Sequence, residues 1–404
     1  MIVKINKGRA FGKINAPPSK SMAHRLIICA SLSGGVSRIS DISDCDDVEA
    51  TLECMAALGV KAQRDGGDVI ITGADMTKAA PDTSLFCHES GSTLRFLVPI
   101  ALLSGKTVMF RGKTGLMRRP MNIYENLCRE KGFVYLSDGE SITVKGPLLG
   151  GEYTVPGNVS SQFISGLLFA LPLQAKDSKI KITPPIESRS YIEMTLMAIR
   201  AFGIRAEWED DHTLVIPGGQ KYKASDLRVE GDYSGAAFTD ALNLLGGEVE
   251  LLGLDKDSIQ GDRVYKKYYE LLEMGIPTLH IGDCPDLGPI LFALSAAKCG
   301  GVFTGTKRLK IKESDRAAAM AKELSKFGVS VSVYEDKVVV YPMSFRAPKE
   351  RLKGHGDHRI VMSLAILLTL VGGEIEGAEA VAKSYPAFFD DLRSLGIEVC
   401  EYEI

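Results

Sequence analysis

The sequence predicts a mixed α/β protein of two similar globular domains, each built from three copies of one repeated unit. Three observations lead to this fold class. A glycine followed by an apolar residue recurs six times after an amphipathic segment, each copy holds an earlier segment that is apolar nearly all round, and strand-like runs accompany both. A chain of 404 residues is long enough for two or three domains.

The repeat has the size of a small subdomain. Successive glycines are 73, 71, 72, 53 and 68 residues apart, a longer period than the roughly 20 to 50 residues of solenoid repeats. A glycine at these places supplies the left-handed conformation that ends many helices. The six are Gly59, Gly132, Gly203, Gly275, Gly328 and Gly396.

Two kinds of helix are expected in each copy. Met194, Met197 and Ala201 recur at helical spacing, so their helix shows one face to water. The segments 164–171 and 290–294 are apolar nearly all round, which indicates buried helices. Six such units imply three-fold packing of helices in each half of the chain. The alternative is an ordinary α/β protein whose glycines recur because most helices end that way.

Composition narrows the class of function. The 48 Lys and Arg nearly balance the 51 Asp and Glu, so binding to nucleic acid or to a membrane surface is not expected. The start, Met1–Ile5, resembles a strand rather than a signal peptide, and the longest apolar run, 360–371, is shorter than the roughly 20 residues of a membrane span. The eight cysteines form no Cys-x-x-Cys pair, which favours reduced core thiols in a cytoplasmic protein and argues against structural zinc.

Basic residues gather where helices are expected to begin. A helix N-terminus carries partial positive charge and disfavours cations. Cations beside its outward-pointing N–H groups nevertheless make a site for anions such as phosphate and carboxylate. For any one of these residues, a solvated surface cation is the alternative. They are Lys20, Arg118 and Arg119 before Pro120, Lys312, His358 and Arg359 after Asp357, and Lys383.

Two further segments, 90–93 and 160–162, place small, hydroxyl or amide residues at expected helix starts, where an ordinary N-cap is the alternative. Gly-x-Gly-x-x-Gly and Walker-type loops are absent from the sequence, so ATP and dinucleotides are not expected. His355 and His358 lack the Cys or carboxylate pattern that would complete a metal site. We therefore expect neither a metal nor a cofactor.

Several motifs spread over essentially the whole chain carry a resemblance to a known family. They are Pro-Ser-Lys-Ser at 18–21 with Arg25, Ser-Gly-Ser-Thr-Leu-Arg at 90–95, Arg-Arg-Pro at 118–120, Val-Ser-Ser-Gln-Phe at 159–163, Val-Glu-Gly-Asp at 229–232, Pro-Asp at 285–286, Ile-Lys-Glu-Ser-Asp-Arg at 311–316, Gly-Asp-His-Arg at 356–359, and Lys383. At these residues the chain closely resembles the 5-enolpyruvylshikimate-3-phosphate synthase family.

The resemblance implies the inverted α/β barrel fold of the enolpyruvyl transferases, with three βαβαββ-type units around a pseudo-three-fold axis in each domain. It implies one domain at residues 13–228, on the shikimate 3-phosphate side. A discontinuous domain, 1–12 together with 229–404, is expected to carry the acid and base, with the active site in the cleft between the two. A cytoplasmic monomer is expected, with small-molecule substrates as its partners.

The implied reaction transfers the enolpyruvyl group of phosphoenolpyruvate to the 5-hydroxyl of shikimate 3-phosphate through a tetrahedral ketal. Asp286, assisted by Lys312, is expected to take the hydroxyl proton. Glu313 is expected to protonate the methylene carbon, with Lys20 and His358 nearby. Shikimate 3-phosphate is expected to contact Lys20, Ser21, Arg25, Ser160, Ser161, Gln162, Ser188, Tyr191, Asp286 and Lys312. Phosphoenolpyruvate is expected to contact Lys20, Gly91, Arg119, Gln162, Arg316, Arg359 and Lys383.

The chain departs from the commonest family pattern at Glu89, Ser92, Arg308 and Gly356, and its Gly91 favours sensitivity to the inhibitor glyphosate. The position of Arg308 is one where a substrate-contacting Asn is common.

Three other functions fit the sequence less well. The sister enzyme that acts on UDP-N-acetylglucosamine has Lys-Asn where this chain has Lys20-Ser21, and usually a reactive cysteine in the loop that is 115–117 here. RNA 3′-terminal phosphate cyclase, built from related repeats, is disfavoured by the nearly neutral charge and by the missing histidine pattern. A non-enzymatic binding module would not need Asp286, Lys312 and Glu313 together.

Overall fold

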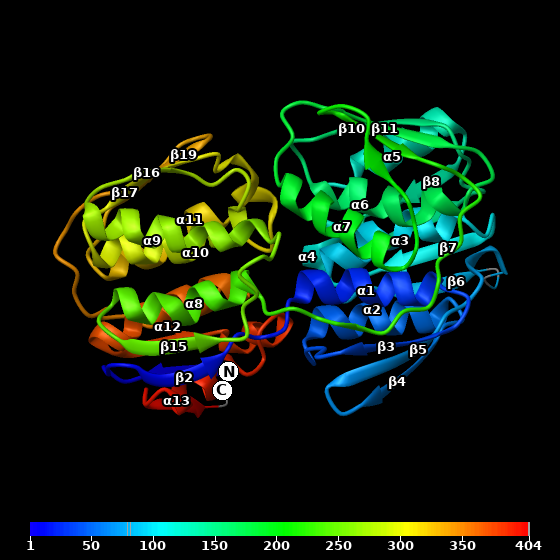
Figure 1. The fold of residues 1–404 in the computed structure, drawn as a ribbon. Helices are drawn as coiled ribbons and strands as arrows, with labels where there is room; N and C mark the ends of the chain where they lie inside the picture. Colours follow the sequence, from blue (N-terminus) through cyan, green and yellow to red (C-terminus); the bar gives the residue numbers. More distant parts are fainter. Residues whose placement is uncertain (79, 81, 403–404) are drawn as a thin grey trace. The chain divides into compact units, whose positions relative to one another are not determined.

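The computed structural model describes residues 1–78, 80 and 82–402. The chain divides into two compact units (Figure 1): unit 1 comprises Met1–Ser19 and Gly231–Ile404, and unit 2 comprises Lys20–Glu230. Each unit combines helices with several small sheets of repeated topology. The predicted class, a mixed α/β protein made of repeated units in two domains, is confirmed.

The boundaries of the units differ from the expected ones by a few residues. The first crossing lies after Ser19 rather than near residue 13, because β2 (Phe11–Asn15) pairs in parallel with β15 (Glu248–Leu252) and so belongs to unit 1. The second crossing lies after Glu230 rather than after residue 228, close to the expected place.

Unit 2 contains three four-stranded sheets of one topology. In each, a parallel pair of strands is followed by two antiparallel pairings. One sheet takes its first strand from the far end of the unit, since β14 (Leu227–Arg228) pairs with β3 (Val36–Ser40). In spatial order the sheets are β14, β3, β5 (Asp68–Thr72) and β4 (Lys61–Asp65); β6 (Thr83–Phe86), β7 (Thr107–Arg111), β9 (Ser141–Lys145) and β8 (Val134–Ser137); and β10 (Glu152–Pro156), β11 (Ser178–Thr183), β13 (Thr213–Ile216) and β12 (Glu207–Trp208).

Two sheets of unit 1 repeat the same topology. One of them is completed by the N-terminal strand β1 (Ile2–Ile5), which pairs antiparallel with both β21 (Gly373–Glu376) and β22 (Val399–Tyr402). In spatial order the two sheets are β16 (Thr278–His280), β17 (Gly301–Thr304), β19 (Lys337–Val340) and β18 (Val331–Val333); and β20 (Leu352–Lys353), β21, β1 and β22.

The remaining copy in unit 1 is shorter than the others. Among the described residues its sheet has only the parallel pair β2 and β15. The chain runs from α9 (Tyr265–Met274) through Gly275 into β16 without an antiparallel hairpin. Such a hairpin follows the corresponding helix in the three copies of unit 2 and follows α11 (Arg316–Lys326) in unit 1 as β18 and β19. This explains why Gly275 and Gly328 are only 53 residues apart.

Each copy contains a buried helix and an amphipathic helix, as expected. Eleven successive residues of α1 (Lys20–Leu32) are buried, whereas four of the ten residues of α5 (Asn122–Lys131) are. The other buried helices are α3 (Gly91–Leu102), α6 (Ser161–Ala170), α8 (Tyr233–Leu244), α10 (Gly288–Ala297) and α12 (His358–Val371), and the other amphipathic ones are α2 (Asp46–Ala57), α7 (Arg189–Ala201), α9, α11 and α13 (Phe388–Ser394). Shorter pieces are α4 (Thr114–Met117) and the 3₁₀ turns η1 (Met76–Lys78), η2 (Leu171–Leu173), η3 (Gly261–Val264), η4 (Pro285–Leu287), η5 (Lys307–Ile311) and η6 (Ala378–Lys383).

The recurrent glycines end the amphipathic helices. After α7, Gly203 has a φ of +81°, its N–H donates to the Arg200 carbonyl, and the Ile204 N–H reaches back to the Ile199 carbonyl. This pair of bonds is a Schellman cap, which requires a left-handed residue. The same pair occurs at Gly59, Gly132, Gly328 and Gly396. Gly275, in the copy without a hairpin, departs from it with a φ of +152°.

Each unit has a hydrophobic core of its own. In unit 2, Phe96 of α3 and Phe169 of α6 pack edge to face with ring centroids 5.4 Å apart. In unit 1, Phe292 of α10 meets Phe303 of β17 at 4.8 Å. All four rings are at most 1% exposed, and burying one such side chain contributes about 1.5 to 3 kcal/mol. These contacts fix the buried helices, and with them the groups at their N-termini.

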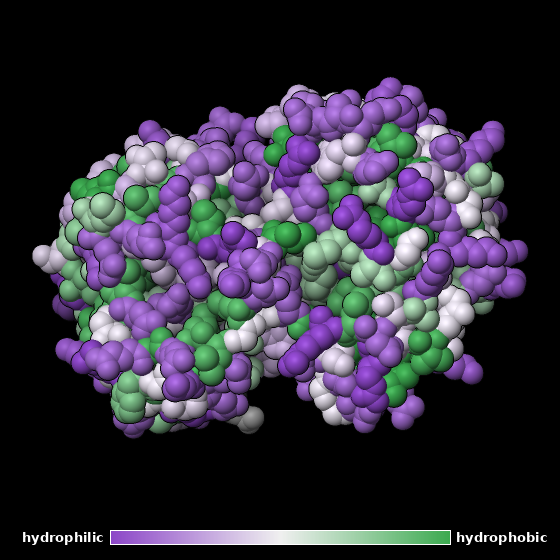
Figure 2. All heavy atoms as spheres, in the orientation of Figure 1, coloured by the Kyte–Doolittle hydropathy of each residue, from purple (hydrophilic) through white to green (hydrophobic). Residues whose placement is uncertain are grey.

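The surface is mainly polar on the face shown in Figure 2, where hydrophilic residues surround smaller apolar patches. Among the described residues, no helix combines the length and the apolarity needed to cross a membrane. The longest apolar run of the sequence lies in α12, where His358 to Thr369 are buried.

Candidate active site

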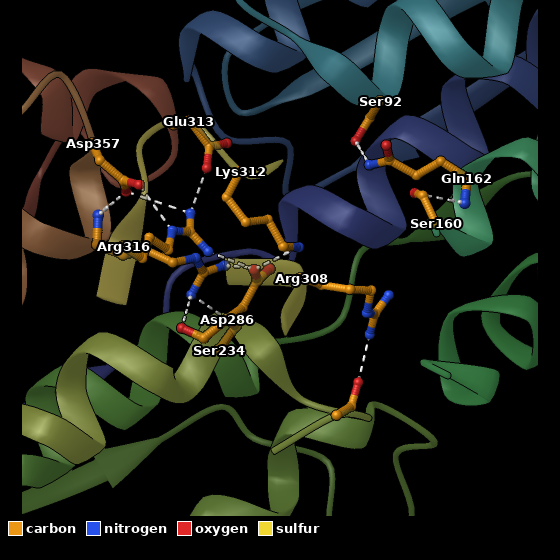
Figure 3. A network of polar contacts seen from close by, with 12 residues as sticks. Ser92, Ser160, Gln162, Ser234, Asp286, Arg308, Lys312, Glu313, Arg316 and Asp357 are labelled. Atoms are coloured by element: carbon orange, nitrogen blue, oxygen red, sulfur yellow. Dashed lines mark hydrogen bonds and ion pairs between the residues drawn. The ribbon is translucent and has the colours of Figure 1, made fainter. Parts of the chain in front are cut away.

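In unit 2, Gln162 joins the first turns of α3 and α6 (Figure 3). Its Nε2 donates to Ser92 Oγ at 2.8 Å, and its Oε1 accepts from Arg95 Nη1 at 2.7 Å. Ser160 is the N-cap of α6 and accepts the Gln162 N–H at 3.3 Å. The two polar segments that the sequence places at helix starts are therefore at helix starts, and they touch each other.

Two more of the predicted serines lie at helix starts in this unit. Ser161 is the first residue of α6 and is 6% exposed. Ser188 precedes α7 in a left-handed conformation with a φ of 57° and is 3% exposed. A non-glycine residue in that conformation is uncommon and often marks a functional segment.

Lys20 is the first residue of α1 and pairs with Asp47 of α2. Its Nζ lies 2.9 Å from Asp47 Oδ2, and the two side chains are 12% and 7% exposed. Asp47 belongs to the acidic first turn of α2, where negative charge suits the positive end of the helix. The pair holds an ammonium group at the start of a buried helix, which the anion-site hypothesis requires.

Arg25 of α1 is fully enclosed and reaches across to α7. Its Nε donates to Thr195 Oγ1 at 2.8 Å, Nη1 to the Ser21 carbonyl at 2.6 Å and Nη2 to the Tyr191 carbonyl at 2.9 Å. The guanidinium also lies over the ring of Phe96, 5.2 Å from its centroid. Burial lowers the pKa of Arg25 to about 10, so the group stays charged at neutral pH. The structure thus brings three predicted residues, Ser21, Arg25 and Tyr191, together.

Gly91 opens α3 beneath two arginines. A Cβ built on it would lie 2.7 Å from Arg119 Nη1 and 3.5 Å from Arg95 Nη1. Ser90 caps the helix, its Oγ accepting the Thr93 N–H at 3.2 Å. Guanidinium groups beside the exposed N–H groups of a helix start suit a phosphate or a carboxylate.

In unit 1, Arg316 is the centre of a second cluster. Its Nη1 donates to Asp286 Oδ1 at 2.8 Å, its Nε to Asp357 Oδ2 at 2.8 Å, and its Nη2 to Glu313 Oε2 (Figure 3). The side chain is 1% exposed. Burial opposes its charge, but the three carboxylates, Asp357 foremost, raise the pKa of Arg316 above its usual value.

Asp286 faces three cations rather than the end of a helix. Besides Arg316, Arg359 Nη2 donates to its Oδ2 at 3.0 Å, and Lys312 Nζ lies 3.1 Å from its Oδ1. Burial raises the pKa of Asp286, but Arg359, Lys312 and Arg316 together hold it well below the usual range. Leu287, which precedes α10, makes no side-chain cap there. The carboxylate is therefore ionised and surrounded by positive charge.

Lys312 and Glu313 follow η5 and flank this carboxylate from the same loop. Burial, aided by Arg316 and Arg308, lowers the pKa of Lys312 despite the neighbouring Asp286. A lowered pKa makes a lysine a more effective partner in proton transfer near neutral pH. Glu313 bonds Arg316 and is 13% exposed.

The start of α12 supplies the remaining groups. Asp357 is its N-cap and accepts the Arg359 N–H at 3.0 Å, as the sequence indicates. The Arg359 side chain reaches Ser234 Oγ of α8 at 2.7 Å. His358 beside it is 1% exposed, and Lys383, the last residue of η6, is 4% exposed. The N-termini of α8, α11 and α12 and the segment before α10 thus meet around Asp286.

The predicted local structure around three cations is wrong. Pro120 does not open a helix, since α5 begins at Asn122. Lys383 ends η6 instead of directly preceding a helix, and Lys312 is separated from α11 by a loop whose Asp315 is the N-cap. A proline at the first helical position and a proline in an extended segment look alike in a single sequence, so the helix starts are displaced from the positions that the sequence indicates.

Four polar residues of these clusters were not singled out from the sequence. Asp47 carried a signal, since acidic residues open α2, and Arg95 lies within a motif. Ser234 follows the N-cap Asp232 and gives no signal of its own. Asp262 is buried, and burial together with Asp286 raises its pKa to about 6; nothing in the local sequence marks it.

Arg308, at one of the departures from the family pattern, is 6% exposed and donates to the Gly282 carbonyl. Among the described residues, no group of three or more His, Cys, Asp or Glu side chains is arranged to hold a metal ion.

Comparison with known proteins adds the identity of the fold and of the family. The family model described as EPSP synthase (3-phosphoshikimate 1-carboxyvinyltransferase) matches residues 5–279 and 272–392. The 3-phosphoshikimate 1-carboxyvinyltransferase of Clostridium kluyveri is 38% identical, covering 100% of this chain and 99% of that protein, and the one of Clostridium perfringens is 41% identical, covering 98% of each.

Solved structures of low identity share the fold. EPSP synthase from Acinetobacter baumannii aligns with a TM-score of 0.77 at 24% identity, covering 99% of this chain and 100% of that one. The enolpyruvyl transferase NikO from Streptomyces tendae aligns with a TM-score of 0.76 at 14% identity, covering 99% and 98%. With full-length relatives at 38% and 41% identity and a family model that spans nearly all of it, the chain belongs to the EPSP synthase (3-phosphoshikimate 1-carboxyvinyltransferase) family.

Proposed function

We propose that this chain transfers the carboxyvinyl group of phosphoenolpyruvate to the 5-hydroxyl of shikimate 3-phosphate, the reaction that names its family. The observation that carries the proposal is the cluster around Asp286, where one buried arginine, Arg316, binds three carboxylates and where Lys312 and Arg359 complete the charge. Binding alone does not require an ionised carboxylate, a lysine of lowered pKa and a second carboxylate side by side, whereas acid–base catalysis does. These groups are Asp286, Lys312 and Glu313.

Anion binding is the first task of both units. The substrates carry phosphate and carboxylate groups, which guanidinium and ammonium groups at helix starts bind best. The residues proposed for shikimate 3-phosphate are Lys20, Ser21, Arg25, Ser160, Ser161, Gln162, Ser188 and Tyr191 in unit 2, with Asp286 and Lys312 in unit 1. Those proposed for phosphoenolpyruvate are Lys20, Gly91, Arg119 and Gln162 in unit 2, with Arg316, Arg359 and Lys383 in unit 1.

The base is Asp286. In the free chain its pKa is low because Arg359, Lys312 and Arg316 surround it, and such a carboxylate is a weak proton acceptor. When Arg316 and Arg359 turn part of their hydrogen bonds toward phosphoenolpyruvate, the carboxylate loses partners and becomes more basic. It then accepts the proton of the 5-hydroxyl as that oxygen bonds C2 of phosphoenolpyruvate, and Lys312 stabilises the charges involved.

The acid is Glu313. In the same step it gives its proton to C3, which becomes a methyl group, and the product is a tetrahedral ketal that holds both substrates. In the second step the C2–O bond to phosphate breaks, a proton leaves the methyl group for the Glu313 carboxylate, and the double bond re-forms. The proton held by Asp286 leaves with the phosphate, which returns both carboxyl groups to their starting state. The departing phosphate is stabilised by fixed cations, Lys20 among them, and His358 is proposed to assist.

The alternative acceptor, UDP-N-acetylglucosamine, is not favoured. The segment 115–117, where a reactive cysteine is usual in that enzyme, is Gly-Leu-Met. The test is phosphate release from phosphoenolpyruvate with either acceptor. Release with shikimate 3-phosphate alone supports the proposal, and release with the amino sugar nucleotide alone overturns it.

We further propose that the chain acts as a monomer in the cytoplasm, on small molecules and without nucleic acid. The near balance of charge supports the absence of nucleic-acid binding, and the scattered free cysteines support a reducing compartment. Sedimentation equilibrium at working concentration is the test of the monomer, and a dimer mass would contradict it.

A further inference from the structure

A chain of four buried polar side chains runs across unit 2 behind the first turns of α1, α2 and α3. His24 Nδ1 lies 2.7 Å from Thr51 Oγ1, Thr51 Oγ1 lies 2.7 Å from Thr93 Oγ1, and Thr93 Oγ1 donates to Ser90 Oγ at 2.7 Å. All four residues are at most 1% exposed. None of them belongs to the residues proposed to contact substrate.

The hydrogen bonds among these four side chains all point the same way, from His24 toward Ser90. Burial lowers the pKa of His24 to about 3, so its ring is neutral and carries one proton. His24 Nε2 has no hydrogen-bond partner within the described chain, and a buried N–H without an acceptor is rarer than a buried acceptor without a donor. The proton is therefore on Nδ1 and is donated to Thr51, which donates to Thr93, which donates to Ser90.

This row of side chains reaches the anion-binding parts of unit 2 at two places, Thr51 and Ser90. Thr51 lies one turn after Asp47 on α2, and Asp47 holds Lys20 at the start of α1. Ser90, at the other end, is the N-cap of α3 and directly precedes Gly91. The Thr51 hydroxyl bonds α1 through His24 and α3 through Thr93, both at 2.7 Å. The Asp47 carbonyl lies farther from these hydroxyls, 3.4 Å from Thr51 Oγ1 and 3.5 Å from Thr93 Oγ1, so the shorter bonds of Thr51 are the stronger link.

We propose that Thr51 is a positioning residue for phosphoenolpyruvate. Through its hydroxyl, Thr51 fixes the position of the Lys20–Asp47 pair relative to the start of α3 at Ser90 and Gly91. The proposal rests on the proposed function, which assigns Lys20 and Gly91 to that substrate. Shikimate 3-phosphate is affected less, because most of its proposed contacts, on α6 and α7, lie outside the chain of hydroxyls.

The test compares Thr51→Val, which keeps the shape of the side chain but removes the hydroxyl, with Thr51→Ser, which keeps the hydroxyl. KM for each substrate and kcat are measured by phosphate release. Thr51→Val is expected to raise KM for phosphoenolpyruvate about tenfold, and KM for shikimate 3-phosphate no more than about twofold. Thr51→Ser is expected to restore values close to those of the unchanged chain.

Two further variants separate positioning from general loss of stability. Thr369→Val removes a buried hydroxyl of α12 that bonds only the Ile366 carbonyl in its own helix, so it is the matched control and should leave both KM values unchanged. Thr93→Val breaks the next link and should show the same split as Thr51→Val, which keeps the test decisive if one variant fails to fold.

The outcomes are distinguishable from those of the proposed function. Equal rises of both KM values in Thr51→Val, an unchanged KM for phosphoenolpyruvate, or a failure of Thr51→Ser to restore it would each overturn the positioning role. If the unchanged chain released no phosphate with shikimate 3-phosphate, the proposed function would fail first. Binding of phosphoenolpyruvate alone, measured by equilibrium dialysis, would then still compare Thr51→Val with Thr51→Ser.

Discussion

Gly91 leaves room for the guanidinium of Arg119. A Cβ on residue 91 would lie 2.7 Å from Arg119 Nη1, which is closer than real Cβ contacts. Its three nearest neighbours are all atoms of arginine side chains rather than of the backbone. An alanine there must displace the end of a flexible side chain, and that side chain is a proposed contact of phosphoenolpyruvate.

Gly91→Ala is therefore expected to fold normally and to bind phosphoenolpyruvate poorly. Losing one charged hydrogen bond costs about 1.5 to 3 kcal/mol, so KM for phosphoenolpyruvate should rise roughly 10- to 100-fold, and KM for shikimate 3-phosphate much less. Steady-state kinetics check this, with Gly34→Ala as the control, since a Cβ on Gly34 meets nothing within 4 Å. Equal rises in the two KM values would remove Gly91 from the phosphoenolpyruvate site.

Asp286→Asn is expected to keep both substrates bound and to lose turnover. An amide oxygen cannot take up the hydroxyl proton, and general-base catalysis is worth about 10² to 10⁴ in rate, so kcat should fall at least about 100-fold. KM for phosphoenolpyruvate should stay level or fall, because Arg316 and Arg359 lose a competing anion. The measurement is kcat and KM across the working pH range.

The matched control for that variant is Asp283→Asn, three residues earlier in the same segment and exposed. It should turn over at the normal rate. A near-normal kcat in Asp286→Asn would show that the carboxylate only organises the neighbouring cations.

The side chain of Glu323 in α11 is expected to make the stability of unit 1 depend on pH. It is fully buried and accepts from Lys326 Nζ at 2.7 Å, the Lys353 N–H at 3.0 Å and His355 Nε2 at 2.8 Å. Burial alone would raise its pKa, but these partners lower the pKa of Glu323 below its usual 4.5. The unfolded chain then binds a proton at a higher pH than the folded chain does, so this stabilisation is present above about pH 4.5 and is lost as pH falls through the lower, folded pKa.

Glu323→Gln should accordingly lower the free energy of unfolding by about 1 to 3 kcal/mol at pH 7, and the deficit should shrink in acid as the original carboxylate becomes protonated. Urea unfolding of both proteins at pH 7 and below pH 4.5 measures it, with exposed Glu350→Gln as the control. If the difference in the free energy of unfolding did not change with pH, the charge of Glu323 would not contribute to stability.

Activity is expected to survive exhaustive chelation. Fixed cations such as Arg316 and Lys20 can neutralise the phosphate and carboxylate of the substrates, which in many phosphate-transferring enzymes is the task of a divalent ion. Phosphate release is compared before and after dialysis against a chelator, then with Mg²⁺ or Zn²⁺ added back. Loss of activity that one metal restores would contradict this prediction.

Features that depend on local periodicity could be predicted from the sequence. Five of the six glycines form the same cap, because a left-handed residue after an amphipathic helix is a local requirement that only glycine meets cheaply. Lys20 at the start of α1 and Arg359 at the start of α12 could be found for the same reason, since each is marked by its own neighbours in the chain.

Features that depend on tertiary pairing could not be predicted in this way. Asp286 directly precedes a buried helix, a position where a carboxylate commonly serves as the N-cap. Its oxygens instead bond Arg316 and Arg359, which are 30 and 73 positions away. Asp262 is marked only by burial near that carboxylate, and the missing hairpin after Gly275 appeared in the sequence merely as one short interval. No local pattern records which distant side chain a charged group will meet.

The pairing of β1 with β21 and β22 has a consequence for the order in which the two units can fold. Unit 2 is one continuous stretch, so it can fold while the rest of the chain is still being translated. Unit 1 cannot, because β1 finds its neighbours β21 and β22 only once residues 373–376 and 399–402 have been made. Stalled chains that end near residue 300 should therefore protect residues 20–230 from protease while leaving the N-terminal strand open to cleavage.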